Sequence, residues 1–218
     1  MPRSQEASLG LTVLQVQPQE RHLVLLVRES KWKDRFLCGH DEREWFVAAV
    51  RGNATTVAQA REALKPEVIR VAEVREGVRP RERQRRRNAA SIRQGEWFFI
   101  PQPGMTVKPS EIVYREPIRR ERGKPHVVAE LYRTGGVTVH TCPEHPNVFT
   151  EEAYRSLLAR HPEAKQWAWS VIRRNVSVYA RGTVRHPDHA TITLPCWHQV
   201  LMNTENSTGQ MGNVAFLD

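Results

Sequence analysis

Residues 11–27 read LTVLQVQPQERHLVLLV, and this stretch decides how the N-terminal part of the chain folds. Two runs rich in leucine and valine, residues 11–16 and 22–27, flank Pro18-Gln19-Glu20. Branched aliphatic residues favour strands, and a proline with polar neighbours between two such runs marks a turn. The pattern therefore predicts a β-hairpin. Because both runs are almost continuously apolar, we expect these strands to be buried on both faces.

The next residues extend this pattern and then change its period. Residues 35–38 and 44–50 are apolar runs that predict further strands of a meander. Thr56 followed three residues later by Gln59 forms a capping-box pattern, which predicts a helix that ends at Pro66. Residues 68–74 are rich in valine and predict a short strand.

Residues 93–101, RQGEWFFIP, form the most hydrophobic aromatic patch in the chain. The patch predicts a core strand, and its alternative interpretation is an aromatic platform on which bases stack. Prolines and a glycine between Pro101 and Pro109 then predict a boundary. We expect a β-rich part over residues 1–100 and an α+β part over residues 110–218, unless the two form one continuous domain.

In the C-terminal half, apolar runs at 127–132 and 137–140 flank Gly135-Gly136, which predicts a turn between two strands. Thr150 before Glu151 is a helix N-cap pattern, and Pro162 predicts the start of a second helix. These two helices would form a helical hairpin.

Apolar runs then predict a terminal antiparallel sheet, at residues 177–180, 182–184, 191–194 and 197–202. The fold class expected for the whole chain is therefore α+β. It combines a β-rich N-terminal part with one helix and a C-terminal part with a helical hairpin and a terminal sheet.

The positive charge is concentrated in two segments. The chain has 33 Lys+Arg, 24 Asp+Glu and a formal net charge of +9. Residues 79–93 hold seven Arg and one Glu, and residues 115–124 hold five cations and two Glu, so the segments contribute +6 and +3. Residues 79–88 have no apolar stripe, and their like charges predict a segment that is extended or frayed in isolation. Concentrated positive charge is typical of proteins that bind a polyanion.

The first functional hypothesis is therefore a nucleic-acid-binding accessory protein that contacts RNA or DNA through phosphates. Such a protein could belong to a larger ribonucleoprotein or mobile-element complex. The candidate contact residues are the cations of the two segments: Arg79, Arg81, Arg83, Arg85, Arg86, Arg87, Arg93, Arg119, Arg120, Arg122 and Lys124.

Each cysteine has a histidine within three residues, which suggests metal binding. Thiolate and imidazole are the ligands that zinc prefers, and four of them suffice for a structural site. The candidates for zinc or another divalent metal all lie within residues 142–198: Cys142, His145, His186, His189, Cys196 and His198. The spacings match no standard zinc finger, so ordinary hairpin and surface histidines are the alternative.

The second hypothesis is a metal-dependent phosphodiesterase or nuclease with His186, His189 and His198 as catalytic residues. His186-Pro187-Asp188-His189 followed by Asn203 is similar to the pattern of metal-dependent His/Asn nucleases, although the final histidine of that pattern is missing. A third hypothesis is a structural subunit that docks an acidic protein. The sequence alone favours a binding protein over an enzyme.

The composition also bears on location. No run of 18 apolar residues occurs, so we expect no transmembrane helix and no membrane partner. The first residues lack the apolar run of a secretory signal, and an odd, sparse set of cysteines fits a reducing compartment. A cytoplasmic protein is the expectation.

Overall fold

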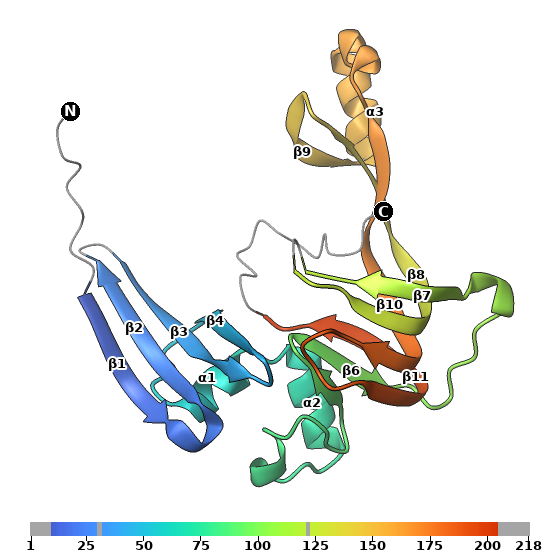
Figure 1. Ribbon diagram of the computed structural model, residues 1–218. Coiled ribbons are helices and arrows are strands. Elements are labelled where there is room, and N and C mark those ends of the chain that lie inside the picture. The colour runs from blue at the N-terminus through green and yellow to red at the C-terminus, as the bar shows by residue number, and fades with distance from the viewer. Residues whose placement is uncertain (1–9, 30–31, 121–122, 205–218) are drawn as a thin grey trace.

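The computed structural model describes residues 10–29, 32–120 and 123–204, which form two antiparallel sheets and three α-helices. One sheet has four strands and the other has seven. Figure 1 shows the smaller sheet on one side, the larger sheet on the other and α2 between them. The α+β class with a β-rich N-terminal part is confirmed. None of the helices in the described ranges combines the length and the apolar content that a bilayer crossing requires.

The first sheet is a four-stranded meander. Its strands are β1 (Gly10–Gln17), β2 (His22–Glu29), β3 (Trp32–Asp41) and β4 (Glu44–Val50), each antiparallel to the next. The helix α1 (Val57–Ala63) begins at the expected capping box and covers one face. The core between helix and sheet includes Val24, Leu37, Ala48, Val57 and Ala60.

The other face of this sheet is not covered by any described residue, so the expectation of two buried faces was wrong. Alternate residues of a strand point to opposite faces, and the apolar residues that face away from α1 remain accessible. Trp45 is 76% exposed, Leu11 and Val47 are each 64% exposed, and Val13 and Val16 are also exposed. We call this surface the outer face of the first sheet.

Residues 68–74 lie within the helix α2 (Glu67–Arg75), not in the expected strand. The strand prediction failed because the strand preference of valine is weak, and burial of one helical face outweighs it. Ile69, Ala72 and Glu73 are buried, whereas Val68 and the other valines are exposed. Ile69 packs against Phe98 and Ile100, which attaches α2 to the second sheet.

The second sheet has the strand order β5-β6-β11-β10-β8-β7, and β9 pairs with β8. The strands are β5 (Ile92–Gln94), β6 (Trp97–Pro101), β7 (Val113–Ile118), β8 (His126–Cys142), β9 (His145–Thr150), β10 (Ser170–Arg185) and β11 (Ile192–Met202). Ile92 of β5 and Ile118 of β7 belong to one core cluster although their strands end the order. The sheet therefore curls around a single core. Trp97 and Phe99 lie fully buried in that core, as the core-strand interpretation predicts.

Residues 97–101 pair with β11 and residues 92–94 pair with β6, so both strands belong to the second sheet. The first sheet has already ended at Val50, so the change of sheet falls before Ile92 and not at the proline-rich loop after Ile100. The division into two domains stays a prediction.

Gly135-Gly136 is not a turn, because β8 runs through both glycines. Both have positive φ, and a Cβ on Gly136 would lie 2.8 Å from the carbonyl oxygen of Arg174 on β10. Gly136 therefore permits a close approach of two long strands, β8 and β10. These strands extend away from the rest of the molecule and carry β9 and α3 (Glu151–Arg160) at their far end (Figure 1).

Thr150 caps α3 as expected, since its hydroxyl accepts a hydrogen bond from the amide of Ala153. The second helix of the expected hairpin is only a short 3-10 helix, Pro162–Gln166. Val171 and Ile172 instead pair with β8 as part of β10. Pairing with β8 thus makes Val171 and Ile172 strand residues, although we expected them in the second helix.

Residues 79–88, which we call the arginine-rich segment, are folded onto the helices and are not extended. Pro80–Glu82 form a 3-10 turn, and the carbonyl oxygens of Arg83 and Gln84 accept hydrogen bonds from Lys65 (2.8 Å) and Arg61 (2.7 Å). Lys65 also forms a buried ion pair with Glu73, Nζ to Oε1 2.8 Å. The hydrogen bonds from Lys65 and Arg61 to the backbone hold a segment that has no apolar stripe of its own.

Candidate metal centre

Three histidines gather at one end of the second sheet. His126 is the first residue of β8, and His186 and His189 lie in the loop between β10 and β11. One ring nitrogen of each lies within 4.8 Å of the others. The ring centroids are 4.2 Å apart for His126 and His186 and 4.5 Å apart for His186 and His189. We call this group the histidine cluster.

The turn Gln94-Gly95-Glu96, between β5 and β6, orients His126. The side-chain amide of Gln94 donates to the carbonyl oxygens of Ala190 (2.7 Å) and Val184 (3.3 Å), so its oxygen faces the histidine. That oxygen lies 2.9 Å from Nδ1 of His126. Nδ1 must then donate, which leaves the lone pair of the neutral ring on Nε2. A metal-ligating histidine is commonly held in this way.

Glu96 and Gly95 complete this turn. The carboxylate of Glu96 lies 3.6 Å from Nε2 of His126. Gly95 has a φ of +57°, and a Cβ there would lie 2.8 Å from Nε2 of His189 and 3.3 Å from Cε1 of His126. Only a residue without a side chain lets both imidazoles approach the turn so closely.

His189 has an incompletely satisfied ring. Its Nδ1 is buried and makes no hydrogen bond to any residue that the structure describes, and Oε2 of Glu42 is 3.4 Å away. That oxygen instead accepts from the amide of Ala190 at 2.7 Å. Burial of a ring nitrogen without a partner costs free energy, and a ligand bound to the ring would offset that cost.

His186 is fixed through the backbone. The amide of Asp188 donates to Nδ1 of His186 over 3.1 Å, so Nδ1 carries the lone pair of the neutral ring. Asp188 is in turn bound by Lys124, Nζ to Oδ2 2.8 Å. The loop that carries two members of the cluster is therefore held by ordered contacts.

Burial keeps these rings neutral. Desolvation lowers the pKa of His186, and the charges of His126 and His189 lower it further. Desolvation also lowers the pKa of His189, against the opposing charge of Asp41. Neutral imidazole is the form that binds a metal, and His186 can become a ligand when its Nδ1 exchanges the hydrogen bond from Asp188 for the ion.

Glu96 is ionised beside the cluster. Burial would raise the pKa of its carboxyl group, but the adjacent ring of His126 and the residue's own backbone amide outweigh burial and lower it. The carboxylate can therefore serve as a fourth ligand or accept a proton from a bound water.

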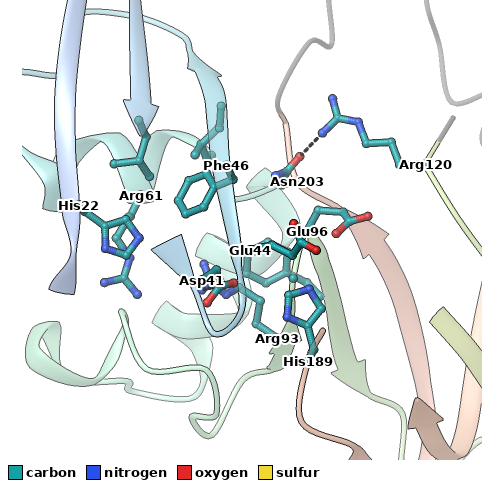
Figure 2. A pocket seen from close by; sticks show the side chains of 15 residues that line it. His22, Asp41, Glu44, Phe46, Arg61, Arg93, Glu96, Arg120, His189 and Asn203 are labelled. Carbon is teal, nitrogen blue, oxygen red and sulfur yellow. Dashed lines mark hydrogen bonds and ion pairs between the residues drawn. The ribbon is translucent and has the colours of Figure 1, made fainter. Parts of the chain in front are cut away.

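A cavity of about 230 Å³ adjoins the cluster. Figure 2 shows Asp41, Arg93 and His189 close together on one side of it, with His22 and Arg61 on the opposite side. Phe46 contributes to the wall that comes from the first sheet. A ligand in the cavity would reach His189 and Glu96 without entering the core.

The other metal ligands expected from the sequence lie elsewhere. In the part of the chain that the structure describes, the three histidines are the one group of at least three candidate ligands this close together. Cys142 and His145 face each other at the β8–β9 turn, far along the projecting strands. His198 is buried in β11, where its Nδ1 donates to the carbonyl oxygen of Cys196 at 2.7 Å. The structure thus brings together His186 and His189 but not the expected set of six.

The expected nucleic-acid contacts divide into two groups. Arg86 pairs with Asp41 and Glu42, Arg93 lines the cavity, and Lys124 pairs with Glu44 and Asp188. Arg83, which donates to the carbonyl oxygen of Val78, and Arg120, which donates to Asn203, are also partly buried. The exposed members are Arg79, Arg81, Arg85, Arg87, Arg119 and Lys124, and Arg122 lies outside the described residues.

Three residues of the site, His126, Gln94 and Glu96, were not predicted from the sequence. His126 is 60 residues from His186 in the chain, and only strand pairing unites them. One signal was present: Gln94-Gly95-Glu96 interrupts the most apolar segment of the chain, and polar residues inside a core segment need partners.

No family model matches this chain, and neither a curated protein nor a solved structure does so. The function is therefore inferred from the geometry of the site.

Proposed function

We propose that this protein is a metal-dependent hydrolase of phosphate esters, with the metal held by His126, His186 and His189. The observation that carries the proposal is the convergence of these three imidazoles beside a cavity whose walls include three arginines, Arg61, Arg93 and Arg120, and three carboxylates, Asp41, Glu44 and Glu96. This is the second of the hypotheses drawn from the sequence, with one ligand added and His198 removed.

The ligand set favours zinc or a similar divalent ion. Three histidines with an open fourth position are typical of catalytic zinc sites. Tetrahedral bonds of about 2.0–2.1 Å place ligand nitrogens about 3.3 Å apart, so the cluster needs to contract by no more than about 1.5 Å. Such an ion supplies a water of lowered pKa.

The chain's own residues supply the remaining functions. Gln94 holds the tautomer of His126, and the carboxylate of Glu96, 3.6 Å from His126, is placed to take the proton of an attacking water. Cationic side chains of the cavity, among them Arg93, would stabilise the charge of a phosphate group.

The hypothesis of nucleic-acid binding remains a separate prediction for the exposed arginines. The partly buried members, such as Arg86, are engaged in ion pairs and support the fold. A surface made of Arg79, Arg81, Arg85 and Arg87 would bind a polyanion outside the cavity, which is compatible with a phosphodiester substrate.

The test combines metal content with turnover. The purified protein should bind about one Zn²⁺ or Mn²⁺ per chain by elemental analysis after dialysis, and should hydrolyse bis(p-nitrophenyl) phosphate only with metal. His186→Ala and His189→Ala should abolish both. The matched control is His145→Ala, at the β8–β9 turn, which should retain both.

Two results would overturn the proposal. One is a folded wild-type protein that binds no divalent metal in calorimetry. The other is an equal loss of metal in the His145→Ala control, which would place the metal elsewhere.

A further inference from the structure

The cavity beside the histidine cluster has walls of two kinds. Apolar side chains, including Phe46 from the first sheet and Phe98 from the second, form one part of its surface. Charged side chains form the rest. Its volume of about 230 Å³ is below the roughly 300–1,000 Å³ of pockets for drug-sized ligands, so its ligand must be compact.

The acidic groups of the cavity are already engaged. Asp41 pairs with Arg86, and Glu44 pairs with Lys124, Oε1 to Nζ 2.6 Å. Glu96 interacts with His126. Cationic partners on the protein thus compensate the charges of Asp41 and Glu44, whereas Glu96 faces an imidazole.

Arg93 is a cation of the cavity whose compensation by a carboxylate is weak. Its guanidinium makes no hydrogen bond to any described residue, and its closest carboxylate contact, Nη2 to Oδ2 of Asp41, is 3.8 Å long. By contrast, Arg61 bonds Glu20 at 2.5 Å and the carbonyl oxygen of Gln84 at 2.7 Å. The side chain of Arg93 is 26% exposed because it borders the cavity.

The physical state of Arg93 suits anion binding. Desolvation lowers its pKa to about 10, against the opposing charge of Asp41, so the group stays charged at neutral pH. A desolvated guanidinium forms strong, two-pronged hydrogen bonds with an oxyanion, and it gains more from such a ligand than a hydrated surface arginine does.

We propose that the cavity binds a compact organic phosphate or phosphonate, whose oxygens pair with Arg93 and whose aromatic or branched apolar group packs between Phe46 and Phe98. The inference rests on the proposed function in one respect: it places the ligand's phosphorus next to His189 and Glu96. Binding itself does not require the metal, because neither Arg93 nor the phenylalanines belong to the histidine cluster.

Calorimetry on the full chain, stripped of metal with a chelator, tests this inference. The probe is phenylphosphonate, and inorganic phosphate and benzyl alcohol each lack one of its two parts. Phenylphosphonate should bind at least about tenfold more tightly than either. Comparable affinity for inorganic phosphate would remove the apolar subsite and overturn the inference. Tighter binding of benzoate than of phenylphosphonate would overturn the choice of phosphate.

Variants assign the two subsites. Arg93→Gln should weaken phenylphosphonate binding about tenfold or more, whereas Arg119→Gln, an equal charge change at an exposed position, should not. Phe46→Ala should weaken phenylphosphonate but not inorganic phosphate. Thermal melting checks that each variant folds, and Arg93→Lys, which keeps the charge but loses the paired geometry, should also bind more weakly. Unchanged affinity in a folded Arg93 variant would overturn the inference.

The two proposals can fail separately. Metal binding and turnover without phenylphosphonate binding to the metal-free protein would reject this ligand but not the hydrolase. Phenylphosphonate binding in a protein that takes up no metal would reject the hydrolase but not the cavity.

Discussion

Gly95 and His189 are packed so closely that a Cβ on Gly95 would lie 2.8 Å from Nε2 of the histidine. Real Cβ atoms essentially never approach a neighbour this closely, so any other residue must displace the ring. The φ of +57° adds a backbone cost for a residue with a side chain. One position thus controls both the turn and the cluster.

Gly95→Ala should therefore weaken both the fold and metal binding. We expect a backbone cost of about 1–2 kcal/mol in the free energy of unfolding, because a left-handed conformation is unfavourable for alanine. Zinc affinity, measured by competition with a chromophoric chelator, should fall by about tenfold or more. Gly104→Ala is the control, since a Cβ there meets no atom within 4 Å. Unchanged zinc affinity in Gly95→Ala would contradict the assigned ligand geometry.

Stability should fall as the pH is lowered through the range where free histidine titrates. His186 and His189 have pKa values below 6.5 in the folded state, mainly through desolvation. As the pH drops below about 6.5, the unfolded chain binds protons first, and the free energy of unfolding decreases until the folded pKa values are passed.

Urea unfolding at several pH values between about 7.5 and 5 measures this loss. His189→Asn should show a shallower dependence, because one of the shifted groups is removed. Losses from groups such as Glu96 belong to a lower range, since the pKa of that carboxyl lies below its ordinary 4.5. A slope that is the same in both proteins would rule out His189 as a contributor.

The buried ion pair between Lys65 and Glu73 is essential for the arginine-rich segment. Both side chains are at most 5% exposed, and Asn88 also donates to Glu73 at 3.1 Å. Glu73→Ala leaves Lys65 with Glu62, Nζ to Oε2 2.9 Å, as its remaining carboxylate partner and removes the acceptor of Asn88, so it should cost about 1–3 kcal/mol of unfolding free energy. Glu76→Ala, an exposed change one residue beyond the same helix, should cost within about 0.5 kcal/mol. Similar losses in the two variants, by chemical denaturation, would refute the role of the pair.

The exposed arginines carry the prediction of nucleic-acid binding. Arg81, Arg85 and Arg87 are exposed, so replacing all three by Gln should weaken binding to duplex DNA with little effect on the melting temperature. The slope of log affinity against log salt should flatten by about 0.9 for each DNA phosphate that the variant no longer neutralises.

The control replaces Lys108, Arg160 and Lys165 by Gln. These residues are also exposed, so the control makes the same change in net charge at another place on the surface. If it reduces the salt slope equally, affinity follows the total charge and the segment is not a binding site.

The sequence predicts local structure where a short pattern has a strong physical cause. The strands at 11–16 and 22–27 and the capping box at Thr56 are confirmed, because alternating burial and a reciprocal cap act over a few residues. Residues 68–74 and 162–172 were mispredicted, because packing on a neighbouring element overrode their preferences.

The sequence predicts only part of the candidate site. His186 and His189 share a short motif, so their proximity could be anticipated. His126 and Glu96 join them only through strand pairing between distant segments, which no local pattern in one sequence specifies. Likewise, the concentration of arginines was visible in the chain, but the acids that bind some of them, such as Asp41, lie more than 40 residues away.

The uncovered outer face of the first sheet has a consequence for colloidal behaviour. Trp45, Val47 and Leu11 place apolar surface in water where no described residue shields it. Two molecules that meet by these faces would bury it, but a net charge of +9 on each makes them repel. Salt screens that repulsion beyond about 10 Å at 0.1 M, while it leaves the apolar attraction in place. Ionic strength therefore sets how closely these molecules approach one another, and light scattering should show mutual attraction that grows as salt is added.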